Sequence, residues 1–135
     1  MPKLLTVIVP CYNEEENIKY FYEEFCKNDA YFLKHAIMYQ LIFVDDGSTD
    51  GTVTEIKNLH QKDKRVKLLS FSRNFGKEAA IYAGLQHASG NLVAIMDVDL
   101  QDPPSLLPQM IDEIFAGADQ VVARRTARQG EPRIR

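Results

Sequence analysis

Five short apolar runs, rich in β-branched residues, recur along the chain and predict buried β-strands. They lie at residues 4–9, 40–44, 66–71, 92–96 and 120–123. None alternates regularly between apolar and polar positions, which is typical of strands covered on both faces. Segments with helical periodicity separate the runs. This alternation predicts an α/β fold with a doubly wound, mainly parallel sheet and helices on both faces.

Four helices are predicted from apolar residues spaced three or four positions apart. Asn13, Asp50 and Asp102 are the expected N-caps of the first, second and fourth helices, because short polar side chains accept hydrogen bonds from the first helical N–H groups. The third helix is expected over residues 77–87, and Pro103 or Pro104 suits the first turn of the fourth. The inward stripes are Ile18, Phe21, Tyr22 and Phe25, then Val53, Ile56 and Leu59, then Ala80, Ile81, Gly84 and Leu85. Residues 31–33 have no clear assignment.

Two aspartates that follow the fourth predicted strand are the strongest sign of chemistry. In an extended backbone, residues two apart point to the same side, so Asp97 and Asp99 can present oxygens to one hard cation while Val98 faces the core. Mg²⁺ or Mn²⁺ would keep several waters there and bridge to substrate phosphates. A solvated acidic loop is the competing interpretation for such a pair standing alone.

Polar clusters also follow the first three predicted strands, and the carboxyl ends of parallel strands share one edge of a sheet. After the first strand, Tyr12 can cover a flat base, and a carboxylate of the Glu14 cluster can accept a base or ribose proton. After the second, one of Asp45 and Asp46 can accept a hydrogen bond from a nucleobase or ribose while the other braces the loop. The sequence does not assign these two roles.

Arg73 and Lys77 follow the third strand and are placed to meet negative charge near a helix start. Each cluster also has a purely structural interpretation. Tyr12 can be an aromatic residue at the edge of the core, residues 45–52 an Asx-rich turn, and Arg73 and Lys77 solvated side chains. A ligand that combines a base with a diphosphate would use all the clusters together, and we therefore favour it.

The composition fits one ordinary domain, since 135 residues with 45% hydrophobic content can bury a core. The net charge of -3 gives no global basic field, so we expect no nucleic-acid partner. Cys11 and Cys26 have no ligand-like spacing and are expected to be reduced, structural cysteines of a cytoplasmic protein. We find no signal-peptide pattern and no apolar run long enough to cross a bilayer.

Four segments carry a resemblance to a known family: residues 6–15 (TVIVPCYNEE), 43–52 (FVDDGSTDGT), 73–77 (RNFGK) and 96–104 (MDVDLQDPP). With these motifs, in order over nearly the whole chain, the sequence resembles a family 2 glycosyltransferase with the GT-A fold. The last motif resembles the branch that transfers a hexose to a polyprenyl phosphate, such as dolichyl-phosphate mannose synthases and bacterial bactoprenol glucosyltransferases. Ser105 stands where many relatives carry Glu, which we expect to alter the helix start more than the chemistry.

The resemblance implies a site and a reaction. Asp97, Asp99 and Gln101 would surround Mg²⁺ or Mn²⁺, with Asp97 and Asp99 as the catalytic carboxylates. The reaction would be inverting displacement at the anomeric carbon of a nucleotide-sugar, with UDP-hexose preferred over GDP-hexose, and the metal would neutralise charge on the departing nucleoside diphosphate. A polyprenyl phosphate acceptor is already anionic and needs no strong base, whereas a saccharide hydroxyl would need one. The expected donor-binding residues are Pro10, Tyr12, Asn13, Glu14, Asp45, Asp46, Arg73, Lys77 and Asp97.

By this resemblance, residues 1–123 would form the nucleotide-sugar-binding core. Residues 124–135 hold five arginines and little that could pack, so we expect a basic mobile loop at the start of an acceptor region outside this chain. Membrane association, at the cytoplasmic face, would come only from such outside parts. A sheet that continues beyond this chain would expose apolar surface, through which copies could form a homo-oligomer.

Three alternatives stay open at this point. A phosphoacceptor receiver module also clusters an acidic pair, an Asp and a Lys, but it leaves the second acidic pair unexplained. A phosphohydrolase would use Asp97 as nucleophile and Asp99 as acid, and it leaves Tyr12, Asp45 and Asp46 without a role. A catalytically silent scaffold would bind nucleotide and transfer nothing.

Overall fold

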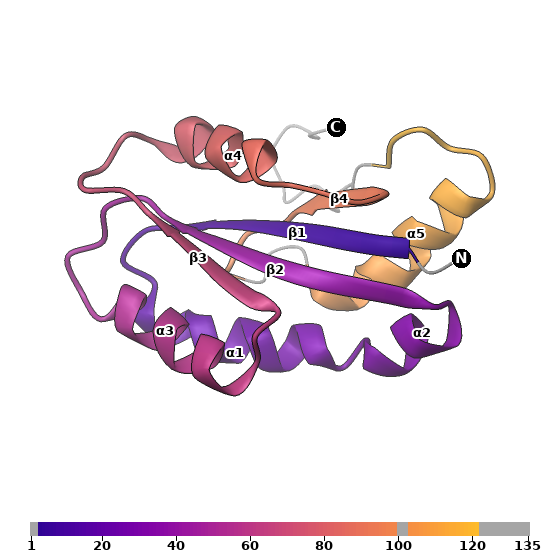
Figure 1. Ribbon diagram of the computed structural model, residues 1–135, viewed down its shortest axis with the longest axis horizontal. Coiled ribbons are helices and arrows are strands. Elements are labelled where there is room, and N and C mark those ends of the chain that lie inside the picture. The colour runs from indigo at the N-terminus through magenta and orange to yellow at the C-terminus, as the bar shows by residue number, and fades with distance from the viewer. Residues whose placement is uncertain (1–2, 100–102, 122–135) are drawn as a thin grey trace, which may run out of the picture.

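A computed structural model describes residues 3–99 and 103–121 of the chain. Strands and helices alternate through these residues, as the sequence predicts (Figure 1). The elements are β1 (Lys3–Cys11), α1 (Glu15–Cys26), α2 (Asp29–Lys34), β2 (Ile37–Asp45), α3 (Thr52–Lys62), β3 (Val66–Ser70), α4 (Lys77–Gln86), β4 (Leu92–Ile95), the 3₁₀ turn η1 (Pro104–Leu106) and α5 (Leu107–Phe115). None of the helices among these residues is both long and apolar enough to span a membrane.

The strands form one parallel sheet in the order β3-β2-β1-β4. The register pairs Lys3 with Ile37 through Cys11 with Asp45 along β1 and β2, and β4 pairs with the other side of β1. The winding therefore changes direction at β1, and the carboxyl ends of β1 and β4 form a topological switch point. Ligands of open α/β sheets bind at such a point. The predicted doubly wound fold is confirmed.

Helices cover both faces of the sheet. Figure 1 shows α4 above the sheet and α1, α2 and α3 below it. The larger core lies on the face of α1, where Phe21 and Phe25 are fully buried and Phe21 meets Phe43 of β2 edge to face. The smaller core lies under α4, where a Cβ added at Gly84 would come within 2.5 Å of Ile8 Cγ2. Glycine at this position thus allows α4 to approach β1 closely.

The edge strand β4 differs from the prediction of strands covered on both faces. Its residues alternate in burial, and Val93 and Ile95 are each 49% exposed. The apolar run does form a strand, but the position of β4 at the edge of the sheet leaves one of its faces partly exposed. The expected strand at 120–123 is not found at residues 120–121, and residues 122–123 lie outside the described ranges.

Two of the predicted helix caps are corrected by the structure. Asn13 is not a cap: α1 begins at Glu15, and the Asn13 backbone has a φ of 51°. Asp50 lies one position before the cap residue of α3, Gly51, yet its Oδ1 accepts a hydrogen bond from the Thr52 N–H at 3.0 Å. It therefore satisfies the first helical N–H from outside the helix.

Other helix predictions have mixed outcomes. Asp102 lies outside the described residues, and Pro104 opens the 3₁₀ turn η1 that leads into α5. Leu85, expected to face inward from α4, is 44% exposed. The unassigned segment 31–33 belongs to α2, whose Phe32 is buried in the larger core.

Candidate functional site

A cavity of about 350 Å³ opens at the switch point of the sheet. Its walls come from the carboxyl ends of β1, β2 and β4 and from the first residue of α4, the places where the polar clusters were predicted to meet. The lining residues are Pro10, Cys11, Tyr12, Glu14, Asp46, Lys77, Asp97, Val98 and Asp99. A second cavity, of about 510 Å³, lies along β3 and contains none of the predicted site residues. The chemistry therefore points to the smaller cavity.

The aspartate pair lies just beyond β4, which ends at Ile95. Asp97 lies in an irregular segment, and Val98 and Asp99 form a turn, so the expected extended backbone does not hold through the motif. The two carboxylates nevertheless line the same cavity, and Val98 is buried in the larger core at 2% exposure. Asp97 and Asp99 therefore face the cavity and Val98 packs in the core, as the sequence predicts.

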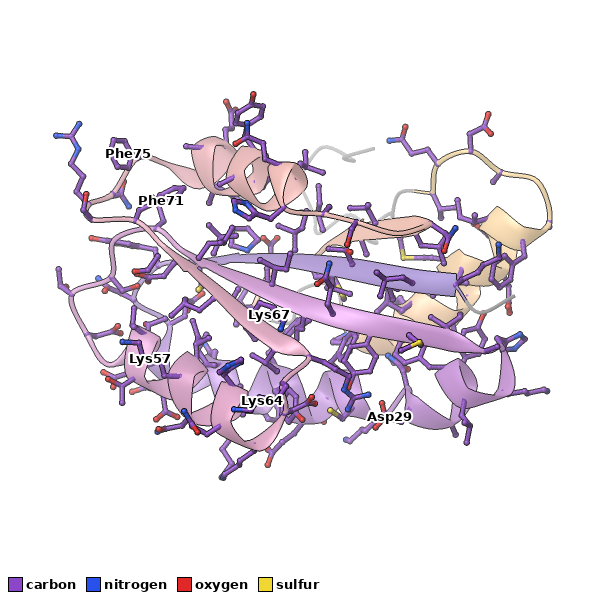
Figure 2. All side chains as sticks on the ribbon, in the orientation of Figure 1. Asp29, Lys57, Lys64, Lys67, Phe71 and Phe75 are labelled. Carbon is purple, nitrogen blue, oxygen red and sulfur yellow. The ribbon has the colours of Figure 1, made fainter. Side chains whose placement is uncertain are left out.

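Lys77 forms an ion pair with one of these acids. Its Nζ lies 2.6 Å from Asp97 Oδ1, where the side chains are 60% and 27% exposed respectively. Arg73 does not line the cavity. Its guanidinium lies over the ring of Phe75, 4.8 Å from the centroid, and Phe75 in turn packs edge to face on Phe71 (Figure 2). The structure thus brings Lys77 into the site and leaves Arg73 outside it.

Asp46 braces the loop that precedes α4. The residue is only 4% exposed, and its carboxylate accepts hydrogen bonds from Phe75 N at 2.8 Å, from Gly76 N at 3.0 and 3.2 Å, and from Asn74 Nδ2 at 3.2 Å. Asp46 also borders the cavity. These bonds hold the residues just before Lys77 against the end of β2.

Asp45 holds the loop after β2 against the end of β3. Its carboxylate is 1% exposed and accepts hydrogen bonds from Ser48 N and Ser70 Oγ, both at 3.3 Å. Gly47 follows with a φ of +79°, and a Cβ there would overlap the backbone of Arg73 and Asn74. Glycine is therefore required for the loops after β2 and β3 to pack together. Both aspartates act as braces, and Asp46 is the one that reaches the cavity.

Asn13 links the loop after β1 to the loop after β2. Its N–H donates to Ser48 Oγ at 2.8 Å, and its side-chain oxygen accepts from Thr49 N at 2.8 Å. The Glu14 N–H donates to Thr52 Oγ1, also at 2.8 Å. Sequence reasoning treated Ser48 and Thr49 as turn residues and missed Thr52. The hydroxyl residues beside an acidic strand end were the sequence signal from which these links could have been predicted.

Tyr12, Glu14 and Cys11 complete the wall on the β1 side. Tyr12 is 46% exposed, so one surface of its ring is open to a ligand. Glu14 Oε1 accepts a hydrogen bond from Asn17 Nδ2 at 3.1 Å. Burial raises the pKa of the Cys11 thiol far above its usual range, and nearby carboxylates raise it further. Cys11 therefore stays protonated and is a poor metal ligand.

The oxygen atoms that Asp97 and Asp99 present to the cavity suit a hard divalent cation. Asp97 and Asp99 supply carboxylate oxygens in one cavity, and a cationic group, the Lys77 ammonium, already lies against Asp97. Within residues 3–99 and 103–121, no group of three or more His, Cys, Asp or Glu side chains is arranged to hold a metal. Mg²⁺ commonly binds one or two protein carboxylates, while phosphates of the ligand complete its coordination sphere. Gln101 and residues 124–135 lie outside the described residues.

Comparison with known proteins shows the same fold in nucleotide-sugar enzymes. A mannosyltransferase from Pyrobaculum calidifontis, solved with GDP-Man and Mn²⁺, matches with a TM-score of 0.68 and 28% identity over 82% of this chain and 32% of its own. S. aureus TarS in complex with UDP-GlcNAc matches with a TM-score of 0.62 and 29% identity over 84% of this chain and 32% of its own. The GT-A fold expected from the sequence is thereby confirmed.

Sequence comparison gives the family. The bactoprenol glucosyl transferase of Shigella phage SfV is 43% identical over 134 residues, which are 97% of this chain and 42% of that protein. The chain spans about two fifths of the length of the curated relatives it matches. The model of glycosyl transferase family 2 matches residues 6–135. The chain belongs to glycosyl transferase family 2.

Proposed function

We propose that this chain is the donor-binding part of an inverting glycosyltransferase that moves a hexose from a nucleotide-sugar to a polyprenyl phosphate. The observation that carries the proposal is the shared cavity: the acids Asp97 and Asp99 line the same space as Tyr12 and Glu14. Tyr12 and Glu14 would thus bind the nucleobase on one side of the cavity, and Asp97 and Asp99 would bind the metal and the phosphates on the other. Residues 1–123 form the core in this proposal, and residues 124–135 begin the acceptor region.

The donor-site residues take separate roles. Asp97 and Asp99, with Gln101, hold Mg²⁺ or Mn²⁺, and the Mn²⁺ in the mannosyltransferase structure supports a divalent ion of this kind. When bound, the metal neutralises charge on the leaving nucleoside diphosphate. Tyr12 covers the base, and Glu14 accepts a hydrogen bond from base or ribose.

The braces act indirectly. Asp45, Asp46 and Asn13 position the loops that carry these groups, because their hydrogen bonds join those loops to one another.

Different observations support the proposed acceptor and the proposed nucleobase of the nucleotide-sugar. The bactoprenol glucosyl transferase of phage SfV supports a polyprenyl phosphate acceptor. We propose that the reaction takes place at the cytoplasmic face of a membrane. An anionic phosphate oxygen attacks without a strong general base. The structural neighbours include both a GDP-sugar and a UDP-sugar complex, and we keep UDP as the first base to test. The family match lends no support to a receiver module or a phosphohydrolase.

Calorimetric titration of UDP and GDP, with and without Mn²⁺, tests the proposal. The expected result is metal-dependent binding of one nucleotide, weakened about tenfold or more by Asp99→Ala, because the metal loses a carboxylate ligand; tenfold corresponds to about 1.4 kcal/mol of binding free energy. Asp119→Ala removes an exposed carboxylate on the loop after α5 and is the matched control. Folded protein that binds neither nucleotide, or binds without regard to metal, would overturn the proposal. Glucosyl transfer to a polyprenyl phosphate by a longer protein containing this chain separates an enzyme from a silent scaffold.

A further inference from the structure

The ion pair between Lys77 and Asp97 places a positive charge where the proposed metal would bind. Lys77 Nζ lies 2.6 Å from Asp97 Oδ1, across the cavity wall from α4 to the segment after β4. By contrast, the ion pairs of Lys27 with Glu24 and of Arg65 with Asp63 join close neighbours in the chain. The pair in the cavity therefore connects two separate elements of the site.

A divalent cation and an ammonium compete for this carboxylate. A metal at coordination distance from Asp97 would lie close to Lys77 Nζ, and two like charges at such a distance repel strongly in a partly buried site. Because the Lys77 side chain is 60% exposed and unbranched, it can move away without disturbing the core. Metal entry thus frees the ammonium within reach of the same cavity.

The backbone of Lys77 is held while its side chain can move. Asp46 accepts hydrogen bonds from Phe75 N and Gly76 N, the two residues that precede Lys77. Gly76 has a φ of +105° and is the cap residue of α4. The ammonium can therefore swing about a fixed point between Asp97 and an anionic ligand in the cavity.

We propose that Lys77 is a placeholder cation: its ammonium neutralises Asp97 in the metal-free site and moves to the donor's diphosphate when a divalent metal takes over Asp97. This inference rests on the proposed nucleotide-sugar site. It predicts that Lys77 weakens metal binding in the absence of nucleotide and strengthens nucleotide binding in the presence of metal. A residue with a purely structural role would change both affinities in the same direction.

The test measures two affinities for wild type, Lys77→Gln and Lys77→Arg. Mn²⁺ affinity without nucleotide is read from the electron paramagnetic resonance signal of free Mn²⁺, and UDP and GDP affinities at saturating Mn²⁺ are read by calorimetry. Lys77→Gln should bind Mn²⁺ about fivefold more tightly and the nucleotide about tenfold more weakly than wild type, while Lys77→Arg stays near wild type in both. These factors follow from removing one charge that is partly screened by solvent.

Lys64→Gln is the matched control, since Lys64 is exposed in the turn before β3 and lies at the α3 side of the molecule in Figure 2. It should change neither affinity. If Lys77→Gln leaves Mn²⁺ affinity unchanged or lowers it while wild type binds nucleotide with metal, the placeholder role is wrong and the proposed function stands. If folded wild-type protein binds Mn²⁺ but no nucleotide, the proposed function fails, and the diphosphate half of this inference fails with it. If wild type binds no Mn²⁺ either alone or in the presence of nucleotide, both proposals are overturned. Circular dichroism verifies that each variant is folded.

Discussion

Asp46→Asn tests whether a buried carboxylate holds the loop before α4. In the native protein the two Asp46 oxygens accept hydrogen bonds from Phe75 N, Gly76 N and Asn74 Nδ2 at 2.8 to 3.2 Å. The asparagine keeps one oxygen, loses the charge, and turns an NH₂ group toward an N–H donor. Hydrogen bonds to charged groups contribute about 1.5 to 3 kcal/mol each, so losing one bond and weakening the others should lower the free energy of unfolding by about 3 kcal/mol.

Urea unfolding followed by far-UV circular dichroism measures this loss. Asp119→Asn makes the same chemical change at an exposed position and should stay within about 0.5 kcal/mol of wild type. The slope of the free energy with urea should be unchanged, since the core is not altered. A loss below about 0.5 kcal/mol for Asp46→Asn would refute the bracing role, because a residue that is only 4% exposed gives solvent little access to replace the broken bonds.

Two further predictions concern the backbone and the charges. Gly47→Ala should lower the free energy of unfolding by about 2 kcal/mol or more in the same assay, because the new Cβ overlaps the backbone of Arg73 and Asn74; Gly117→Ala, with a φ of +116° and no neighbour within 4 Å, should cost only the backbone strain of about 1 kcal/mol. Asp63 should make the protein lose about 1 kcal/mol of stability as the pH falls from about 4 to 2, after allowance for solvent screening, because the Arg65 guanidinium holds the pKa of this carboxyl at about 2, below its unfolded value. A pH dependence of unfolding equal in wild type and Asp63→Asn would contradict this.

The layout of the site could be predicted because it depends on local patterns. Apolar runs mark the strands, helical periodicity separates them, and parallel strands must then end at a common edge. Asp97 and Asp99 are therefore found in the cavity with Tyr12 and Glu14. Val98 is buried as predicted, although a turn and not the expected extended strand places it there.

The details that sequence reasoning missed depend on contacts between distant segments. Asn13 was predicted to cap α1, but Ser48 and Thr49, more than thirty positions away, hold it in a left-handed conformation. The roles of Asp45 and Asp46 were left open because they are fixed by Ser70 at the end of β3 and by Phe75 in the loop before α4. Burial of β4 was overestimated for a related reason, since an apolar run does not state its position in the sheet.

The hydrogen bonds among these loops explain why the site can be ready before any ligand arrives. Asn13 joins the loop after β1 to the loop after β2, and Asp46 joins the loop after β2 to the start of α4. Each of these links uses backbone N–H groups, which do not move without unfolding the loop. The contact of α4 with Asp97 is different, because it depends on one long, exposed lysine side chain. Replacing the ion pair between Lys77 and Asp97 by a ligand contact would cost little reorganisation free energy, because the rest of the site is already in place. In the proposed donor site, the rigid links would therefore position the binding residues, and the Lys77 link is the part that a metal ion would replace.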